Sequence, residues 1–374
     1  MKRIIFISLM NGTPWGGSEV QWFEMARWLS RRGHRVEVVM FGREGNEARR
    51  EELSEAGCSL KLMPFSEGKL DWKGKRRLAS FLKNVDFEGA DLCFVSQGGW
   101  SEVVHDPFVK LWKRMRKFVL IFHNYQTGKK LKFMKKRRLQ AFSGAAYRNI
   151  SDSKKLFDVL ESSYGIEIPR QVPVCNPITF DPPESASPFP NDWEREALIM
   201  CVLAWLDVKR KSQDHLLRVL SSPKWKDRHW TLRLCGDGPD KELLNELAEE
   251  YGLQSKVDLP GNVAPQTELG EAHVFLQLTA IDSMPVSLVE AAAMARPILA
   301  TKVGDMPLWV EDGVNGLLAS DSSDAELDAV LERLWSSRSK LPEMGAQSFE
   351  VFKKRYPDPY VPELLERAGL GDLL

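Results

Sequence analysis

Short apolar runs alternate with segments of helical periodicity from the start of the chain. The first run, Ile4 to Leu9, has the length and composition of a buried strand. Ser18 to Arg32 then carries apolar residues at the spacing of one helix face, and Gly33 is suited to end that helix. Arg35 to Phe41 has the pattern of a second strand. The chain is therefore predicted to open with a β-α-β unit.

The same alternation continues along most of the chain. Further strands are predicted from short apolar runs at 60–63, 91–95, 118–122, 148–151, 197–203, 230–235, 256–259, 274–278 and 297–301. Helices are predicted at 213–220, 241–251, 286–295 and 324–335. Strands that alternate with helices are typical of parallel sheets, and such sheets bind ligands outside the carboxyl ends of their strands.

Prolines interrupt this alternation in one window. Six of them fall between Pro173 and Pro190, which is too many for a helix or a central strand and indicates a linker. The alternation restarts after the window, and a length of 374 residues itself favours two domains over a single core. We predict an α/β protein of two doubly wound, Rossmann-like domains, residues 1–178 and 179–349, facing a central cleft.

Composition limits the classes of function. With 43% hydrophobic and 28% charged residues the chain can bury substantial cores, and its zero net charge gives no general attraction to nucleic acid. The five cysteines are spaced without close pairs, which argues against a zinc site or a disulfide framework and fits a reducing cytoplasm. The apolar N-terminal run is too short for a signal peptide, and no run approaches the ~18–20 apolar residues of a membrane span.

Two carboxylates lie eight residues apart in the second half, at Asp282 and Glu290. Asp282 follows a predicted strand, whereas Glu290 falls in a helix that is apolar on nearly every side. Pro285 suits the first turn of that helix, and Ser283 is placed to cap it. An ionised carboxylate in a buried helix needs hydrogen-bond partners, which a polyhydroxylated ligand would supply. The spacing alone also allows paired acid and base catalysis.

Four other loops after strands carry candidate chemistry, each with a plain structural alternative. The adjacent Gly16 and Gly17 at a helix start allow a phosphate or sugar cradle, or only a tight turn. His123 can contact a ligand, or serve as a hydrogen-bonded structural residue. The cations Lys209 to Lys211 can bind a diphosphate, or remain solvated. The Gly236–Pro239 segment is equally compatible with a simple glycine turn.

Four segments between Leu276 and Leu318 form a specific pattern. They are Asp282-Ser-Met-Pro-Val-Ser-Leu-Val-Glu290, Ala295-Arg-Pro-Ile-Leu-Ala-Thr301, Val303-Gly-Asp-Met-Pro307 and Glu311-Asp-Gly-Val-Asn-Gly-Leu317. This pattern resembles the retaining GT-B glycosyltransferases of family 4, also called glycosyl transferases group 1. Supporting matches across nearly the whole chain are Gly16-Gly17, Gly33-His-Arg-Val-Glu-Val38, His123, Ser151-Asp-Ser153, Asn176-Pro-Ile178, Lys211-Ser-Gln-Asp214, Gly236-Asp-Gly-Pro239 and Gly261-Asn-Val263.

The resemblance implies a role for each matched residue. Glu290 would bind the ribose hydroxyls of a nucleotide sugar, Asp282 would hold the sugar hydroxyls, and Lys211 would stabilise charge on the leaving diphosphate. The backbone at the helix start would face the sugar and diphosphate, which concerns Ser283, Met284, Pro285, Val286 and Ser287. The other implied donor contacts come from Gly16, Gly17, His123, Gly238, Asn262 and Val263, with the last two at the base.

The implied reaction is transfer of a sugar from a nucleotide-diphosphate sugar to a glycan, lipid-linked or small-molecule hydroxyl, with retention at the anomeric carbon. Envelope polysaccharide or glycoconjugate synthesis is the implied context. No cofactor and no metal are expected, because a lysine and a helix dipole would replace the metal. In this fold a C-terminal tail commonly packs back on the first domain, which we expect of residues from about 350 to 374, with a break at 356–359.

Three positions depart from the family pattern. Trp205 stands where an arginine usually precedes the lysine, so Lys209 or Arg210 would have to supply the second cation. Asp282 replaces the usual glutamate and is one methylene shorter, and Ser283 stands where glycine is common. These differences leave open the donor preference and a catalytically weak sugar-nucleotide-binding protein. Another GT-B nucleotide-sugar enzyme, such as an epimerase or a phosphorylase, is a further alternative because it would share the architecture.

A basic stretch suggests a further partner. Lys110 to Arg138 holds twelve Lys or Arg residues and no Asp or Glu, interleaved with apolar side chains. Such a surface suits peripheral contact with anionic lipid at the inner face of a membrane, although a solvated face is the alternative. Nucleic acid is not an expected partner, because no binding motif accompanies the charge. The apolar residues of this stretch and just after it are Leu111, Trp112, Met115, Leu131, Phe133, Met134, Leu139 and Phe142.

Overall fold

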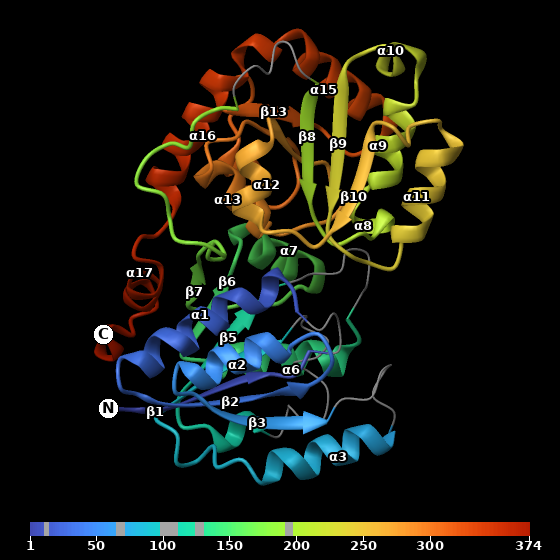
Figure 1. The fold of residues 1–374 in the computed structure, drawn as a ribbon. Coiled ribbons are helices and arrows are strands. Elements are labelled where there is room, and N and C mark those ends of the chain that lie inside the picture. The colour runs from blue at the N-terminus through green and yellow to red at the C-terminus, as the bar shows by residue number, and fades with distance from the viewer. Residues whose placement is uncertain (11–14, 65–71, 98–110, 124–130, 191–196) are drawn as a thin grey trace. The chain divides into compact units, whose positions relative to one another are not determined.

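The computed structural model of the chain describes residues 1–10, 15–64, 72–97, 111–123, 131–190 and 197–374. The chain divides into two compact units (Figure 1). Unit 1 consists of Met1–Pro177 and Pro357–Leu374, and unit 2 of Ile178–Tyr356. The chain therefore leaves unit 2 after Tyr356, seven residues later than the predicted end at 349.

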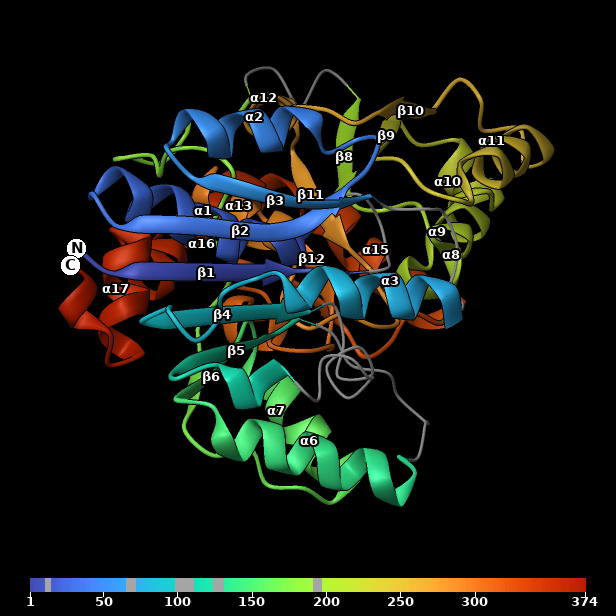
Figure 2. The ribbon, with the colours of Figure 1, turned by 90° about the horizontal axis from the view of Figure 1, so that it is seen from below.

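The described part of unit 1 contains one parallel sheet of seven strands in the order β3-β2-β1-β4-β5-β6-β7. Figure 2 shows its strands from β3 to β6 side by side in this order. The strands are β1 Arg3–Ser8, β2 Arg35–Gly42, β3 Ser59–Pro64, β4 Leu92–Gln97, β5 Phe118–Phe122, β6 Arg148–Ser151 and β7 Gln171–Pro173. The α-helices in the N-terminal segment of unit 1 are α1 Gly17–Arg31, α2 Glu47–Glu55, α3 Trp72–Lys83, α6 Phe133–Ala145 and α7 Lys154–Tyr164. The strands predicted for this half are confirmed, and β7 is an addition that ends at Pro173, the first residue of the proline window.

The apolar runs form central strands because both faces of a parallel sheet are covered. Ile4 to Ile7 in β1 are at most 1% exposed, and Phe6 stacks on Phe94 of β4 with ring centroids 4.6 Å apart. Continuous burial of this kind favours unbroken runs of β-branched and aromatic residues over alternation. The carboxyl ends of β1 and β5 lead to Gly16 and His123, so both candidates follow strands of one sheet.

Unit 2 contains, in its described residues, a parallel sheet of six strands in the order β10-β9-β8-β11-β12-β13. The strands are β8 Leu198–Leu203, β9 Trp230–Cys235, β10 Val257–Gly261, β11 Val274–Gln277, β12 Ile298–Thr301 and β13 Gly316–Ala319. The helices are α8 Val208–Lys211, α9 Gln213–Leu220, α10 Pro223–Lys226, α11 Lys241–Glu250, α12 Pro265–Glu271, α13 Val286–Ala293, α14 Met306–Trp309, α15 Asp324–Ser336 and α16 Leu341–Arg355. All predicted elements of this half are present, and the structure adds β13 and the short helices α8, α10, α12 and α14.

The C-terminal tail divides between the two units. Helix α16 begins at Leu341 and belongs to unit 2, where Gly345 packs so closely on Ala295 that an added Cβ would lie 2.3 Å from its carbonyl oxygen. Helix α17, Tyr360–Arg367, belongs to unit 1. The predicted break is therefore present and the tail belongs to unit 1 as expected, but it does so from Pro357 and not from about residue 350.

The proline-rich window is not a free linker. Its residues from Ile178 onward belong to unit 2. The guanidinium of Arg296 donates to the Pro188 carbonyl over 2.7 Å, and the ring of Phe189 packs on His273 with centroids 5.7 Å apart. Prolines that cannot join a helix or a central strand here form an irregular segment held by side chains.

The basic stretch does not form one continuous surface, contrary to expectation. Its middle is the buried strand β5, and Leu111 and Met115 within it, like Leu139 and Phe142 just after it, are at most 8% exposed. Phe133 and Met134 at the start of α6 are 70% and 59% exposed. Lys110 and residues 124–130 lie outside the described residues. Among the helices that are described, none is long and apolar enough to cross a membrane.

Replacing Tyr360 with Phe tests how α17 is held in unit 1. The Tyr360 hydroxyl donates to the Cys175 carbonyl over 2.7 Å and accepts from the buried Gln21 amide over 2.9 Å. Its loss should lower the free energy of unfolding by about 1–3 kcal/mol, because buried polar groups lose partners. Urea unfolding measures the change. Tyr147→Phe removes an exposed bond to the Gly369 carbonyl as the control, and an equal loss in both variants would contradict the argument.

Candidate functional site

The loop between β11 and α13 is held by hydrogen bonds to α8 on one side and to β12 on the other. The Thr279 hydroxyl donates to the Arg210 carbonyl over 2.6 Å, and the backbone N–H of Ala280 donates to the same oxygen over 3.0 Å. On the other side, the Thr301 hydroxyl at the end of β12 donates to the Thr279 carbonyl over 2.7 Å. The loop that carries Asp282 is therefore fixed between the end of α8 and the end of β12.

Gly304 packs directly against the backbone of the same loop. Its φ of +56° lies in the left-handed region, and a Cβ added there would lie 1.9 Å from the Ser283 carbonyl oxygen. The neighbouring Asp305 N–H donates to that oxygen over 2.9 Å. Only glycine allows this approach without displacing the backbone. The sequence placed Gly304 in the family pattern but did not reveal that it positions Asp282.

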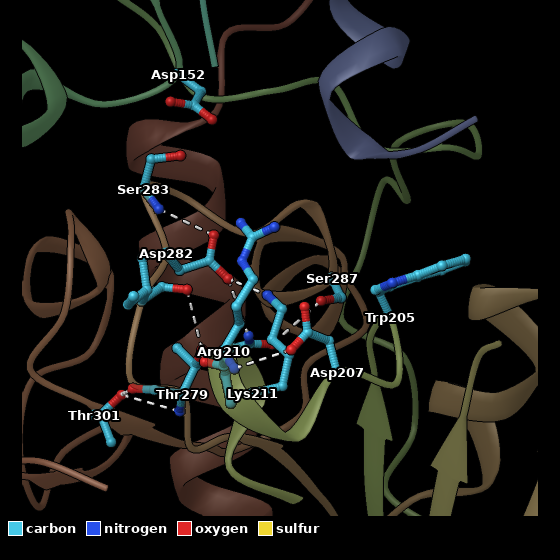
Figure 3. A network of polar contacts seen from close by, with 12 residues as sticks. Asp152, Trp205, Asp207, Arg210, Lys211, Thr279, Asp282, Ser283, Ser287 and Thr301 are labelled. Atoms are coloured by element: carbon cyan, nitrogen blue, oxygen red, sulfur yellow. Dashed lines mark hydrogen bonds and ion pairs between the residues drawn. The ribbon is translucent and has the colours of Figure 1, made fainter. Parts of the chain in front are cut away.

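Lys211 and Asp282 form an ion pair at the centre of the site (Figure 3). Both side chains are 16% exposed, so the pair is partly shielded from water. Gln277 extends the network, because its amide donates to Asp282 Oδ2 over 3.3 Å and its oxygen accepts from the Ser287 hydroxyl over 3.4 Å. The structure thus brings together three predicted site residues, and Gln277 is a member that sequence reasoning missed.

Helix α13 begins without a side-chain cap. Pro285 is its N-cap residue, so the expectation that Ser283 caps the helix was wrong. The Ser283 N–H instead donates to Asp282 Oδ1 over 3.0 Å. The first backbone N–H groups of a helix lack intrahelical partners and carry partial positive charge, which suits an anion. Ser283, Met284 and Pro285 are buried, whereas Val286 and Ser287 are half-buried.

Glu290 is 2% exposed within α13. Its Oε1 accepts from the backbone N–H of Thr179 over 3.1 Å and from the Thr179 hydroxyl over 2.5 Å. Burial raises the pKa of the Glu290 carboxyl, and the two hydrogen bonds from Thr179 offset part of this rise. The partner that the helix requires is thus supplied within unit 2 by Thr179, which the sequence had placed only near a domain boundary.

The cations before and around α8 differ in placement. Lys209 is exposed and Arg210 is half-buried, with its carbonyl bound to the loop that leads to Asp282. Trp205 is 40% exposed, and Figure 3 shows its indole directed away from Lys211. Of the two residues proposed to replace the missing arginine, Arg210 lies closer in the structure to the Asp282 loop.

The glycine turn after β9 is explained by backbone packing. A Cβ at Gly236 would lie 2.0 Å from the Ala204 carbonyl oxygen, and one at Gly238 would lie 2.3 Å from that of Leu206. The turn is therefore required by the fold, whatever ligand it contacts. At the end of β10, Asn262 is exposed and Val263 is half-buried.

In unit 1, Gly16 is the N-cap of α1 and Gly17 its first residue. Burial lowers the pKa of His123 to about 3, and its Nε2 lies 3.0 Å from the Ser96 hydroxyl. A neutral imidazole of this kind can accept or donate a hydrogen bond but carries no charge at neutral pH. The sequence missed Glu19, a 5% exposed carboxylate in the first turn of α1 that accepts from Ser8 and Trp22.

Two supporting motifs are structural in unit 1. The Ser153 hydroxyl accepts from the Leu156 N–H and caps α7. The Asn176 amide donates to Asp152 Oδ2 over 3.2 Å and ties the end of unit 1 to the loop after β6. Residues 11–14 and Asn124, which flank the glycine pair and His123, lie outside the described residues.

Two family models match the chain in succession. The model described as Glycosyltransferase Family 4 matches residues 15–179, and the model described as Glycosyl transferases group 1 matches residues 196–337. The first lies almost entirely in unit 1 and the second wholly in unit 2.

Curated relatives match over shorter lengths. The chain is 30% identical over 155 residues to the GDP-mannose-dependent alpha-(1-6)-phosphatidylinositol monomannoside mannosyltransferase of Mycobacterium tuberculosis. That match covers 38% of this chain and 40% of the relative, so it spans well under half of either protein.

Solved structures match over the whole chain. Anabaena Alr3699/HepE in complex with UDP-glucose gives a TM-score of 0.77 at 17% identity and covers 100% of both chains. Sucrose-phosphate synthase from Thermosynechococcus elongatus gives 0.76 at 15% identity, covering 99% of this chain and 98% of the other. These likenesses show the fold, and the two family models cover most of the sequence. The chain belongs to the GT-B glycosyltransferases of family 4, whose second domain is the glycosyl transferases group 1 domain.

Proposed function

We propose that the protein transfers a sugar from a nucleotide-diphosphate sugar to a hydroxyl of a glycan, a lipid-linked acceptor or a small molecule, with retention at the anomeric carbon. The observation that carries this proposal is the arrangement within unit 2 of Lys211, Asp282 and the uncapped start of α13, with Glu290 buried one turn further on. A cation, free helix amides and two carboxylates match the diphosphate, sugar and ribose of such a donor.

The proposed chemistry assigns separate tasks to these groups. Lys211 would move from Asp282 to the diphosphate and stabilise the charge that grows there as the glycosidic bond breaks. Asp282 would then be available for the sugar hydroxyls. The leaving phosphate oxygen would take the proton of the incoming hydroxyl on the same face of the sugar, which gives retention. A lysine and helix amides at the diphosphate would make a metal unnecessary in this step.

The relatives support a nucleotide-sugar donor and a role in glycan or glycolipid synthesis. The Anabaena structure is reported with UDP-glucose, and the mycobacterial relative is named for GDP-mannose and a phosphatidylinositol mannoside. Another relative, 34% identical over 109 residues, is the putative colanic acid biosynthesis glycosyltransferase WcaL of Salmonella typhimurium. We infer that this activity belongs to polysaccharide or glycolipid synthesis, and we propose separately that it takes place on the cytoplasmic side of a membrane.

We also propose that the start of α6 contacts that membrane. Phe133 and Met134 are large, exposed and adjacent, and the cations Lys132, Lys135, Lys136, Arg137 and Arg138 flank them in the sequence. Exposed apolar side chains can insert at the headgroup boundary while lysine and arginine attract anionic lipid. This surface is smaller than the full basic stretch, because Leu111 and Met115 of that stretch are buried.

Glu290→Gln tests donor binding. Nucleotide-diphosphate sugars with different bases and sugars should be screened by calorimetry, and the variant should weaken binding of the responding compound by about 1–3 kcal/mol, because a charged hydrogen bond to ribose is lost. The unliganded variant should melt no lower at pH 7, since burial already disfavours the charged form and Gln can still accept from Thr179. Glu343→Gln, at an exposed position in α16, is the matched control. A lack of response to every nucleotide sugar would refute the transferase proposal, and unchanged affinity in Glu290→Gln would refute the ribose assignment.

Lys211→Gln tests the leaving-group role. It should lower kcat by about 10²–10³-fold with a much smaller change in KM, as expected when charge stabilisation acts mainly in the transition state. Transfer of radiolabelled sugar to acceptor measures the rate. Lys226→Gln, exposed at the end of α10, should retain the wild-type kcat. A kcat for Lys211→Gln within threefold of wild type would reject the role.

Membrane contact is tested by sedimentation with liposomes. The wild-type protein should sediment with anionic vesicles at low salt and not with neutral ones, and Phe133→Ser with Met134→Ser should abolish most of this binding because the inserting groups are gone. Leu243→Ser, which removes a 39% exposed leucine in unit 2, should behave as wild type. Failure of the wild-type protein to sediment would end the proposal.

A further inference from the structure

Three metal-ligating side chains meet inside unit 2, at Cys201, Cys235 and Glu268. Each offers one ligand atom, and these atoms all lie within 4.8 Å of one another. The three residues are 0%, 2% and 9% exposed. Such a group was not expected from the sequence, in which the two cysteines are 34 positions apart and no ligand spacing is visible.

Strand pairing explains how the thiols meet. Strands β8 and β9 are parallel neighbours, with Cys201 opposite Arg233 and Leu203 opposite Cys235. The two cysteines are therefore diagonal neighbours that project from the same face of the sheet. Helix α12 packs against β8 and contributes Glu268. Ala272 completes the small buried cluster, and Leu203 and Val263 pack against it.

This cluster is separate from the Lys211 site. Val202 and Leu234, which alternate with the cysteines along β8 and β9, belong to the large core on the opposite face of the sheet. The small pocket beside Lys211 is lined from that opposite face by Val202, Leu216, Leu276 and Leu278. A cation bound at the cysteines would therefore not take the place of Lys211 in binding a diphosphate.

The ligand set has the chemistry of a zinc site. Thiolate and carboxylate ligands suit Zn²⁺, and ligand atoms about 3.8 Å apart surround it tetrahedrally at Zn–S distances near 2.3 Å. Separations within 4.8 Å need only small side-chain rotations to reach this geometry. The carboxylate is oriented from outside, because Arg233 Nη1 donates to Glu268 Oε1 over 3.1 Å and to Glu271 Oε2 over 2.8 Å. Metal-binding carboxylates are commonly held in this way.

We propose that Cys201, Cys235 and Glu268 bind a divalent, borderline-soft cation such as Zn²⁺, with a solvent molecule as the fourth ligand. The bound cation would link two central strands to α12 and thereby stabilise unit 2. The hydrogen bond to Cys235 and burial hold the pKa of the Cys201 thiol well above its ordinary range, so the cation has to displace a proton when it binds there.

Titration of the full, tag-free chain with Co²⁺ under reducing conditions tests the site. Co²⁺ bound to thiolates gives a ligand-to-metal charge-transfer absorption in the near ultraviolet, which Zn²⁺ should then abolish by displacement. One equivalent of Co²⁺ should saturate the band, and Zn²⁺ should raise the melting temperature. Absence of the band up to millimolar Co²⁺ would overturn the proposal.

Matched variants separate ligation from folding. Cys201→Ser and Cys235→Ser should lose the band, whereas Cys93→Ser, a buried cysteine of β4 in unit 1, should keep it. Glu268→Gln and Glu271→Gln each remove one partner of Arg233, but only Glu268→Gln should weaken Co²⁺ binding, by at least tenfold. If a cysteine variant fails to fold, this glutamate pair still decides. Equal affinity in the two glutamate variants, or a band that survives Cys201→Ser, would refute the site.

Discussion

A buried carboxylate sets the main constraint on unit 2. Glu290 lies in a helix that is otherwise apolar in its second half, and a charge without partners at such a position would be strongly destabilising. Thr179 supplies two hydrogen bonds to one oxygen of the carboxylate. This interaction holds the first residues of unit 2 against α13. The hydrogen bonding of the Glu290 carboxylate therefore depends on where the chain enters unit 2. It also explains why a residue that looks like a catalytic acid in the sequence suits a binding role: it is buried and hydrogen-bonded, and proton transfer requires contact with a reacting group.

The second constraint is the positioning of Asp282 by backbone contacts. The hydroxyls of Thr279 and Thr301 hold the loop by hydrogen bonds to backbone carbonyls. Gly304 approaches the Ser283 carbonyl so closely that no side chain fits between them. The ion pair with Lys211 forms on this rigid loop. The site is therefore built from three loops of one sheet, at the carboxyl ends of its strands, as the general rule for open parallel sheets requires.

The two faces of the unit 2 sheet carry different chemistry from the same strands. Alternation along β8 and β9 sends Val202 and Leu234 into the large core and Cys201 and Cys235 to the other side. The large core supports the loops that hold Lys211 and Asp282. The opposite face gathers thiols and a carboxylate beside α12, where a cation would stabilise strand pairing without contacting Lys211. Because successive side chains of a strand point to opposite faces of the sheet, the proposed structural metal site and the proposed metal-independent reaction lie on opposite sides of the same strands.

The sequence by itself determined the alternation of strands and helices, the two-domain α/β class and the acidic pair, because apolar periodicity and short motifs are local properties of the chain. It did not determine Thr179, Gln277 or the positioning role of Gly304, whose effects arise only when distant segments meet. It suggested one basic membrane surface, whereas the fold buries Leu139 and Phe142 and leaves Phe133 and Met134 exposed, since a helix face is chosen by packing and not by charge. Cys201 and Cys235 are far apart in the sequence, and only the pairing of β8 with β9 brings them together. Contacts between residues far apart in the chain depend on strand register, and register is decided by the tertiary structure.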